Sequence, residues 1–173
     1  PKPVSDFASA LLDEVNAYID GNRKPGLSTG LIDLDRMLGG LKGGKLYILA
    51  GRPGMGKSSL GLQTAIVAGK QGKTVLYFSL EMMGVELTIR MVSAQTGLDG
   101  KRIEEGALTG DDYNLFNSGL DKVSKWPVYI DDRTRTVEGI RARATLQAAD
   151  ELDLIVVDYI QRVQVGKGFD NRN

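Results

Sequence analysis

Four short apolar runs alternate with longer helical patterns along the chain. The runs cover residues 45–50, 74–79, 126–130 and 152–157, and most of their positions are apolar in succession rather than in alternation. Uninterrupted apolar runs of this length are typical of strands that are buried on both faces. Strands that alternate with helices favour βαβ units. We therefore predict an α/β fold, with a mostly parallel sheet and helices on both of its faces.

The segments between these runs carry helical signals. Helices are predicted over residues 29–38, 85–95 and 137–149, together with one that follows residue 57 and one that begins near Thr109. Thr109 and Asp112 have the spacing of a capping box, and Gly97 is placed to end the preceding helix. The stripe that follows Thr109 is predicted to face the core, and it consists of Tyr113, Phe116, Leu120 and Val123.

An amphipathic helix is predicted over residues 5–20, ahead of the first apolar run. Ser5 can cap its start and Gly21 can end it, and its apolar stripe consists of Phe7, Leu11, Val15 and Tyr18. Residues 21–26 have the composition of a linker. We therefore expect a linker helix and linker at residues 1–26 and the main domain at residues 27–173. The stripe either folds back onto the core of that domain or docks on another subunit.

Composition narrows the chemistry that is open to this chain. Its 173 residues suit one domain, and 22 basic residues balance 22 acidic ones, which argues against a protein that binds nucleic acid through overall charge. The absence of Cys and His excludes disulfides, Cys-based zinc sites and the usual Ser-His and Cys-His hydrolases. No apolar run approaches the roughly 18 residues of a membrane span, and no signal-peptide pattern is present, so we expect a soluble, cytoplasmic protein without a membrane partner. Because the chain starts at Pro1 and not at Met, we also expect a fragment or a processed chain.

The first apolar run leads into a glycine-rich loop. Residues 51–58 read Gly-Arg-Pro-Gly-Met-Gly-Lys-Ser, which satisfies the pattern G-x-x-x-x-G-K-[ST]. A strand before this pattern and a helix after it identify a P-loop, which binds the phosphates of a nucleoside triphosphate. Gly51, Gly54 and Gly56 let the backbone curl so that N–H groups point at phosphate oxygens, and the following helix presents its positive N-terminal end to the same anion.

Lys57 and Ser58 complete the predicted loop. Lys57 brings a full positive charge to the β- and γ-phosphates, and the hydroxyl of Ser58 can ligate Mg²⁺. The predicted nucleotide-binding residues are Gly51, Arg52, Pro53, Gly54, Met55, Gly56, Lys57, Ser58 and Ser59.

Three of the predicted strands end in acidic residues that could complete such a site. Ligands of open α/β sheets bind outside the carboxyl ends of the strands, and hydrolysis needs one carboxylate for Mg²⁺ and another group to orient or deprotonate water. Asp158 follows the most apolar run, which predicts a central strand beside the P-loop, and we assign it to the metal. Asp131 is a rival with the same local pattern, although a turn is favoured for Asp131 and Asp132. Glu81 either reaches the γ-phosphate or is an acid favoured at a helix N-terminus.

One basic cluster stands out, made of Arg133, Arg135, Arg141 and Arg143. Arg141 and Arg143 would point to different faces of their helix. A solvated surface is therefore favoured over contact with nucleic acid or with another subunit.

These residues, in this order, resemble the C-terminal ATPase domain of the DnaB-type replicative helicases, within the RecA-like P-loop proteins. The resemblance extends from residue 27 to residue 172 and is carried by the segments 28–36, 50–58, 78–82, 128–132, 140–143 and 155–161. Single motifs of this kind are shared by all RecA-like ATPases, but the ordered set is specific.

The resemblance implies a fold, an activity and partners. The fold would be RecA-like, and the cofactors would be ATP and Mg²⁺. Glu81 would be the catalytic base beside Lys57, and Asp158 would bind Mg²⁺, which decides both alternatives above. The protein would form hexameric rings that translocate on single-stranded DNA, with residues 5–20 packed on the neighbouring subunit. Primase and a helicase loader would be further partners, in the cytoplasm of a bacterial or phage-infected cell.

The resemblance also has limits. The family's arginine finger, polar sensor and DNA-contacting loops lie in segments that follow residue 173, and its primase-binding N-terminal domain precedes this chain. We therefore expect the nucleotide-binding half of a motor, with DNA contacts mostly beyond residue 173. The alternative is a RecA-like ATPase that acts as a nucleotide-controlled assembly switch or recombination factor and does not unwind DNA.

Overall fold

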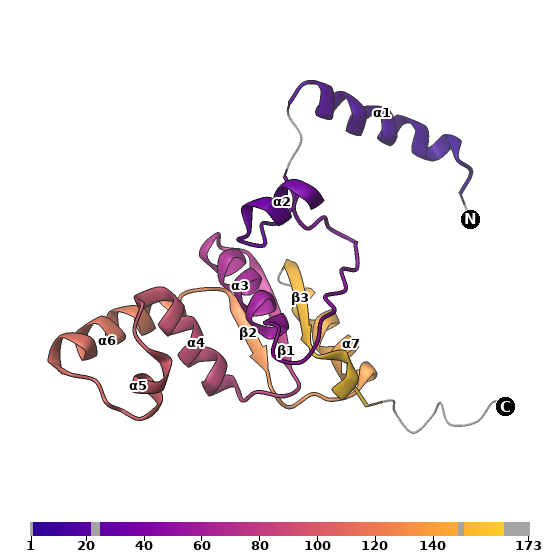
Figure 1. The fold of residues 1–173 in the computed structure, drawn as a ribbon. Coiled ribbons are helices and arrows are strands. Elements are labelled where there is room, and N and C mark those ends of the chain that lie inside the picture. Colours follow the sequence, from indigo (N-terminus) through magenta and orange to yellow (C-terminus); the bar gives the residue numbers. More distant parts are fainter. Residues whose placement is uncertain (1, 22–24, 149–150, 165–173) are drawn as a thin grey trace.

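A parallel sheet of three strands lies at the centre of the part of the chain that the structure describes. In this computed structural model the described residues are 2–21, 25–148 and 151–164. Strand β1 (Thr74–Ser79) lies between β2 (Val128–Asp131) and β3 (Leu152–Asp158) (Figure 1). Val75 pairs with Val128 on one side and with Leu154 on the other. The predicted parallel sheet is confirmed.

Helices cover both faces of this sheet. The described helices are α1 (Ser5–Ile19), α2 (Ile32–Leu38), α3 (Lys57–Lys70), α4 (Gly84–Thr96), α5 (Gly100–Glu104), α6 (Gly110–Ser124) and α7 (Val137–Gln147), with a 3₁₀ helix at Ile160–Arg162. Helix α3 contacts all three strands, and α7 contacts β1 and β3 from the other side of the sheet (Figure 1). As a result, all residues of β1 after Thr74 are buried, whichever face they point to. The prediction of helices on both faces is confirmed.

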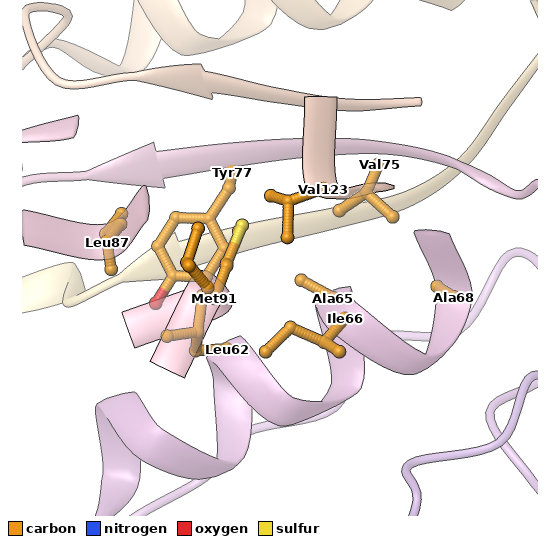
Figure 2. Close-up of a cluster of buried hydrophobic side chains, with 10 residues drawn as sticks. Leu62, Ala65, Ile66, Ala68, Val75, Tyr77, Leu87, Met91 and Val123 are labelled. Carbon is orange, nitrogen blue, oxygen red and sulfur yellow. The ribbon is translucent and has the colours of Figure 1, made fainter. Parts of the chain in front are cut away.

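The hydrophobic core joins the central strand to α3 and α4. The ring of Tyr77 lies among Leu62, Leu87 and Met91, and Val75 packs near Ala65 and Ala68 (Figure 2). Each fully buried side chain of this size contributes about 1.5–3 kcal/mol. Because α3 is fixed to β1 in this way, the glycine loop that precedes α3 is held close to the carboxyl end of the sheet.

The predicted strand at residues 45–50 is wrong. These residues form no strand, and Leu46 and Ile48 are 86% and 81% exposed. A strand needs a neighbour that takes its backbone hydrogen bonds and a cover for its faces. Both edges of β1 are occupied by β2 and β3, and residues 45–50 pair with the outer edge of neither of these two strands. An apolar sequence alone supplies neither requirement, so the segment is an irregular connection into the glycine loop.

The central strand was also assigned to the wrong apolar run. The sequence places the run before Asp158 at the centre, whereas β1 is central and β3 is its neighbour on one side. Asp158 is the one buried residue of β3. The other residues of this strand are either partly buried or exposed. Apolar content therefore indicated a strand correctly but did not indicate its place in the sheet, which depends on packing partners far away in sequence.

Three features of the predicted helices differ in detail. Ser5 does not cap α1, because the residue at the cap position is Val4 and no side chain caps that end. Thr109 does stand at the cap of α6, but its hydroxyl bonds the carboxylate of Asp112, which also pairs with Arg102. Of the stripe predicted as core on α6, only Val123 is buried and Phe116 packs against the core, whereas the other two residues, Tyr113 and Leu120, are exposed.

Helix α1 stands apart from the sheet (Figure 1). None of its residues is buried, and its apolar side chains, including Phe7, Leu11 and Val15, are largely exposed. In this structure, therefore, the helix does not fold back onto the core of its own domain, which was one of the two alternatives. Docking on another subunit stays a prediction.

Candidate nucleotide-binding site

The glycine loop has the backbone geometry that a phosphate-binding loop requires. Gly54 and Gly56 have φ angles of +77° and +84°, a left-handed conformation that residues with a Cβ rarely adopt. Helix α3 begins directly after Gly56, and no side chain caps its first turn and no acidic residue lies in it. The N–H groups of that turn therefore keep their positive end available to an anion.

Lys57 already lies over this loop. Its Nζ atom donates hydrogen bonds to the carbonyl oxygens of Gly51 and Arg52, at 3.1 and 3.2 Å. The ammonium group is thus held on the side of the loop formed by its first two residues. A phosphate that enters the loop would meet both the N–H groups of α3 and this charge, a combination that favours anions strongly.

The next residue of α3 reaches an acidic residue one hundred positions away. Ser58 Oγ donates a hydrogen bond to Asp158 Oδ1 at 2.9 Å, and Asp158 is only 8% exposed. The sequence predicted these two residues as the metal-binding pair, and the structure brings them into contact. Their roles toward a metal stay a prediction.

A third residue, which sequence reasoning missed, completes this cluster. The hydroxyl of Tyr77 donates a hydrogen bond to Asp158 Oδ2 at 3.0 Å. Burial raises the pKa of Tyr77 far above its ordinary value, and the charge of Asp158 and this hydrogen bond raise it further. Tyr77 therefore remains a protonated donor at physiological pH. The only signal in the sequence was a tyrosine among the apolar residues in the middle of the strand.

Glu81 lies beside the same carboxyl edge. The backbone N–H of Leu80 donates to the backbone oxygen of Asp158 at 2.7 Å, which ties the end of β1 to the end of β3. Glu81 follows Leu80 directly and is exposed, so its carboxylate is accessible to solvent just beyond the carboxyl end of β1. The pKa of Arg162 is raised, first by its hydrogen bond to the Tyr159 hydroxyl and by the charge of that hydroxyl. The negative charge of Glu81 makes a smaller contribution in the same direction. Sequence reasoning did not single out Arg162.

Asp131 and Asp132, the rivals for the metal, are engaged in local structure. The carboxylate of Asp131 accepts hydrogen bonds from the N–H groups of Arg133 and Thr134, at 3.0 and 2.8 Å, and from the Thr134 hydroxyl at 2.7 Å. Burial alone would raise the pKa of Asp131, but these bonds and nearby Arg143 hold it below its usual value. Asp132 accepts a bond from the N–H of Gly84 at the start of α4, at 2.8 Å. These contacts favour the turn interpretation.

The arginine cluster is divided between solvent and the sheet edge. Arg133 and Arg141 are exposed, as the solvated-surface prediction requires. Arg143 Nε lies 3.6 Å from Asp131 Oδ2. Arg135 differs, because it is partly buried and donates to the backbone oxygens of Asp132 and Ser79 at 3.2 and 3.5 Å. Its guanidinium group therefore lies at the carboxyl ends of β1 and β2.

The donor set between α3 and β3 fits Mg²⁺. This ion prefers oxygen ligands and is usually held by one or two carboxylates together with phosphates and water. Ser58 and Asp158 offer a hydroxyl and a carboxylate. Within residues 2–21, 25–148 and 151–164, no group of three or more His, Cys, Asp and Glu could hold a metal ion.

Comparison with known proteins decides the family. The sequence matches the family described as DnaB-like helicase C terminal domain over residues 26–173. The chain belongs to this family. Over 98% of this chain, it is 33% identical to the replicative DNA helicase DnaB of Synechocystis. Over 85% of this chain, it is 36% identical to the replicative DNA helicase DnaB of Geobacillus stearothermophilus. The chain spans 20% and 33% of the length of these two relatives.

Solved structures agree on the fold. The chain superposes on a structure described as the ATPase domain of G40P with a TM-score of 0.84 at 22% identity, covering 95% of this chain and 61% of that one. A second structure, described as a DnaB-like replicative helicase and its interactions with primase, gives 0.83 at 20% identity and covers 99% of this chain and 42% of that one. The RecA-like fold expected from the sequence is confirmed. In the described part of this DnaB-like chain, no helix has the length and apolar character needed to cross a bilayer.

Proposed function

We propose that this chain is the ATP-binding and ATP-hydrolysing motor domain of a hexameric replicative DNA helicase that translocates on single-stranded DNA and unwinds duplex. The observation that carries the proposal is the contact between the start of α3 and the end of β3. A loop with left-handed Gly54 and Gly56 opens onto the uncapped start of α3. One residue into that helix, Ser58 meets the carboxylate that ends β3. The names of the relatives support a helicase over a nucleotide-controlled switch.

The proposed roles follow from position. The loop residues Gly51 to Gly56, with Ser59, surround the phosphates through their backbone, and Lys57 Nζ leaves the carbonyl groups of Gly51 and Arg52 to meet the β- and γ-phosphates. Ser58 and Asp158 hold Mg²⁺, which when bound neutralises part of the phosphate charge. Glu81, exposed just beyond the carboxyl end of β1, orients and deprotonates the attacking water.

The domain division and the ring are part of the proposal. Residues 1–26 form a linker helix and linker, and residues 27–173 form the ATPase domain. The family match from residue 26 supports this boundary, as does the backbone pairing of Leu27 with Leu41. The exposed apolar side of residues 5–20 packs on the neighbouring subunit of a homo-hexamer. A helix of this kind gains about 25 cal/mol for each Å² of apolar surface that it buries.

The remaining partners are proposed from the relatives. Single-stranded DNA would be bound by segments mostly beyond residue 173. Primase is a proposed partner because a structural relative is described with its primase interactions, and a helicase loader is another. The two relatives named above, from Synechocystis and Geobacillus stearothermophilus, are bacterial, which supports a place in the cytoplasm of a bacterial or phage-infected cell.

Unwinding of a forked DNA substrate by the intact protein tests the proposed function. We expect strand separation with ATP and Mg²⁺ and none with a non-hydrolysable analogue. An intact protein that binds ATP and changes its assembly state, but separates no strands, would instead be the switch or recombination factor.

Sedimentation tests the ring contact separately. Leu11→Glu places a charge on the apolar side of α1 and should reduce the hexamer fraction, whereas Ser9→Glu on the opposite side of the same helix should leave it unchanged. Equal hexamer fractions for the two variants would contradict the docking of residues 5–20.

A further inference from the structure

Tyr77 carries a hydroxyl group into the most deeply buried part of the protein. It lies on the central strand β1, its side chain has no exposed surface, and its ring is packed among Leu62, Leu87 and Met91 (Figure 2). A phenylalanine would fill nearly the same space as Tyr77. The next residue of the strand, Phe78, is such a side chain and is also fully buried. A buried hydroxyl costs about 1–3 kcal/mol if it finds no partner, so its position needs an explanation.

The partner of this hydroxyl is the carboxylate that faces the P-loop helix. Tyr77 donates to Asp158 Oδ2 at 3.0 Å, while Ser58 donates to the other oxygen, Oδ1, at 2.9 Å. Asp158 is thus held from two sides, by the core and by the first turn of α3. With Oδ2 bound to the core, Oδ1 is the oxygen that faces Ser58 and the glycine loop.

The hydroxyl is also placed by the close approach of α3. A Cβ atom on Gly61 would lie 3.7 Å from the Tyr77 hydroxyl and 3.5 Å from Val156. These are ordinary van der Waals distances, so α3 passes within contact distance of the end of the tyrosine ring. The hydroxyl is enclosed between α3 and β3, where Asp158 is the acceptor that it reaches.

From this arrangement we infer that Tyr77 is a positioning residue for the metal–nucleotide site: its buried hydroxyl holds Asp158 so that Oδ1 faces Ser58 and the P-loop. The inference rests on the proposed function, because it assumes that Asp158 and Ser58 serve Mg²⁺. Groups that hold metal ligands from behind typically change metal affinity by about 10–100-fold when they are removed. Tyr77 touches neither the nucleotide nor the ion and acts only through Asp158.

The test is a Mg²⁺ titration of nucleotide binding in the intact protein, read out by a fluorescent ADP analogue. Tyr77→Phe removes only the hydroxyl, and Tyr129→Phe on the neighbouring strand β2 is the matched control, because that side chain is half exposed and points away from the cluster. For Tyr77→Phe we expect the Mg²⁺ concentration at half-maximal binding to rise about tenfold. Nucleotide affinity at saturating Mg²⁺ should stay close to that of the wild type, and Tyr129→Phe should match the wild type throughout.

The outcomes separate the inference from the function on which it rests. If wild-type binding does not depend on Mg²⁺, the proposed metal site itself is wrong. If the wild type depends on Mg²⁺ and Tyr77→Phe needs the same concentration or less, the hydroxyl is only a satisfied core group and the inference is overturned. The effect must also disappear in an Asp158→Asn background, because Tyr77 acts through that carboxylate.

A second measurement covers the case in which Tyr77→Phe does not fold. Incorporation of 3-fluorotyrosine at residue 77 alone keeps the hydroxyl group, and it gives a single ¹⁹F resonance that needs no comparison with a Tyr77→Phe sample. This resonance should shift as Mg²⁺ is added in the presence of nucleotide. A resonance that does not respond to Mg²⁺ would contradict the inference.

Discussion

Replacing Asp131 by Asn separates the structural role of this acid from a metal-binding role. Asp131 accepts two backbone hydrogen bonds and one hydroxyl bond, from Arg133 and Thr134, and its side chain is 14% exposed. An amide keeps the shape and one acceptor oxygen but loses the negative charge. Bonds to a charged group are worth about 1.5–3 kcal/mol and neutral ones about 0.5–1.5. We sum this difference over the three bonds and reduce it because the side chain is partly exposed. The free energy of unfolding should then fall by about 2 kcal/mol, or about 30-fold in the folding equilibrium.

The pH dependence of this loss has a defined sign. The pKa of Asp131 is lowered in the folded protein, so its charged form is the one that the fold stabilises. Its contribution is therefore complete above the unfolded-state pKa of about 3.9 and is lost as the pH falls through the lower folded-state value. The difference between wild type and Asp131→Asn should be full at neutral pH and should shrink below about pH 4, because protonated Asp resembles Asn.

Urea unfolding at several pH values measures this effect, with nucleotide binding as the second readout. Asp121→Asn is the control, because Asp121 makes an exposed ion pair with Lys125 and should change stability by at most about 0.5 kcal/mol. The Mg²⁺ concentration at half-maximal nucleotide binding should be the same for wild type and Asp131→Asn. A large shift in that concentration, with little loss of stability, would show that Asp131 holds the metal and would refute its assignment to Asp158.

Three further substitutions, the last with a matched control, give separate tests. Lys57→Ala removes the charge that lies over the loop and should weaken nucleotide binding by about 2–4 kcal/mol in an equilibrium titration of the intact protein; unchanged affinity and turnover would refute the P-loop assignment. Glu81→Gln should leave ATP binding intact and lower hydrolysis by roughly 10²–10⁴-fold in a phosphate-release assay, and normal hydrolysis would reduce Glu81 to a helix-end acid. Gly69→Ala should destabilise the domain by about 1–3 kcal/mol because its Cβ would lie 2.6 Å from Val128. Gly61→Ala, in the same helix with only ordinary contacts, should be neutral or stabilising in the same thermal-unfolding measurement, and equal effects at both sites would contradict the packing of α3 on β2.

The features that the sequence predicted well are those whose causes are local. Gly54 and Gly56 adopt left-handed angles because the loop pattern itself demands them. Helix α4 ends at Gly97, which is left-handed as its position in the pattern indicates. The turn at Asp131 is also local, since its bonding partners lie within three residues.

The features that the sequence missed depend on partners far away in the chain. Residues 45–50 have the composition of a buried strand, but composition does not provide a paired neighbour or a covering helix. Tyr77 could be recognised as a core residue, yet the acceptor of its hydroxyl lies 81 positions further on. The exposed side of α6 at Tyr113 and Leu120 has the same origin, because a helical stripe indicates a packing face without saying how much of it is covered.

A structure of the intact protein with a non-hydrolysable ATP analogue and Mg²⁺ tests the central claim most directly. The account predicts the β- and γ-phosphates on the loop of residues 51–56, with Lys57 Nζ moved from the carbonyl of Gly51 to the phosphates. It predicts Mg²⁺ at about 2.1 Å from Ser58 Oγ, a distance typical of this ion, with Asp158 bound directly or through a water molecule. A nucleotide bound away from this loop, or a metal held by Asp131, would contradict it.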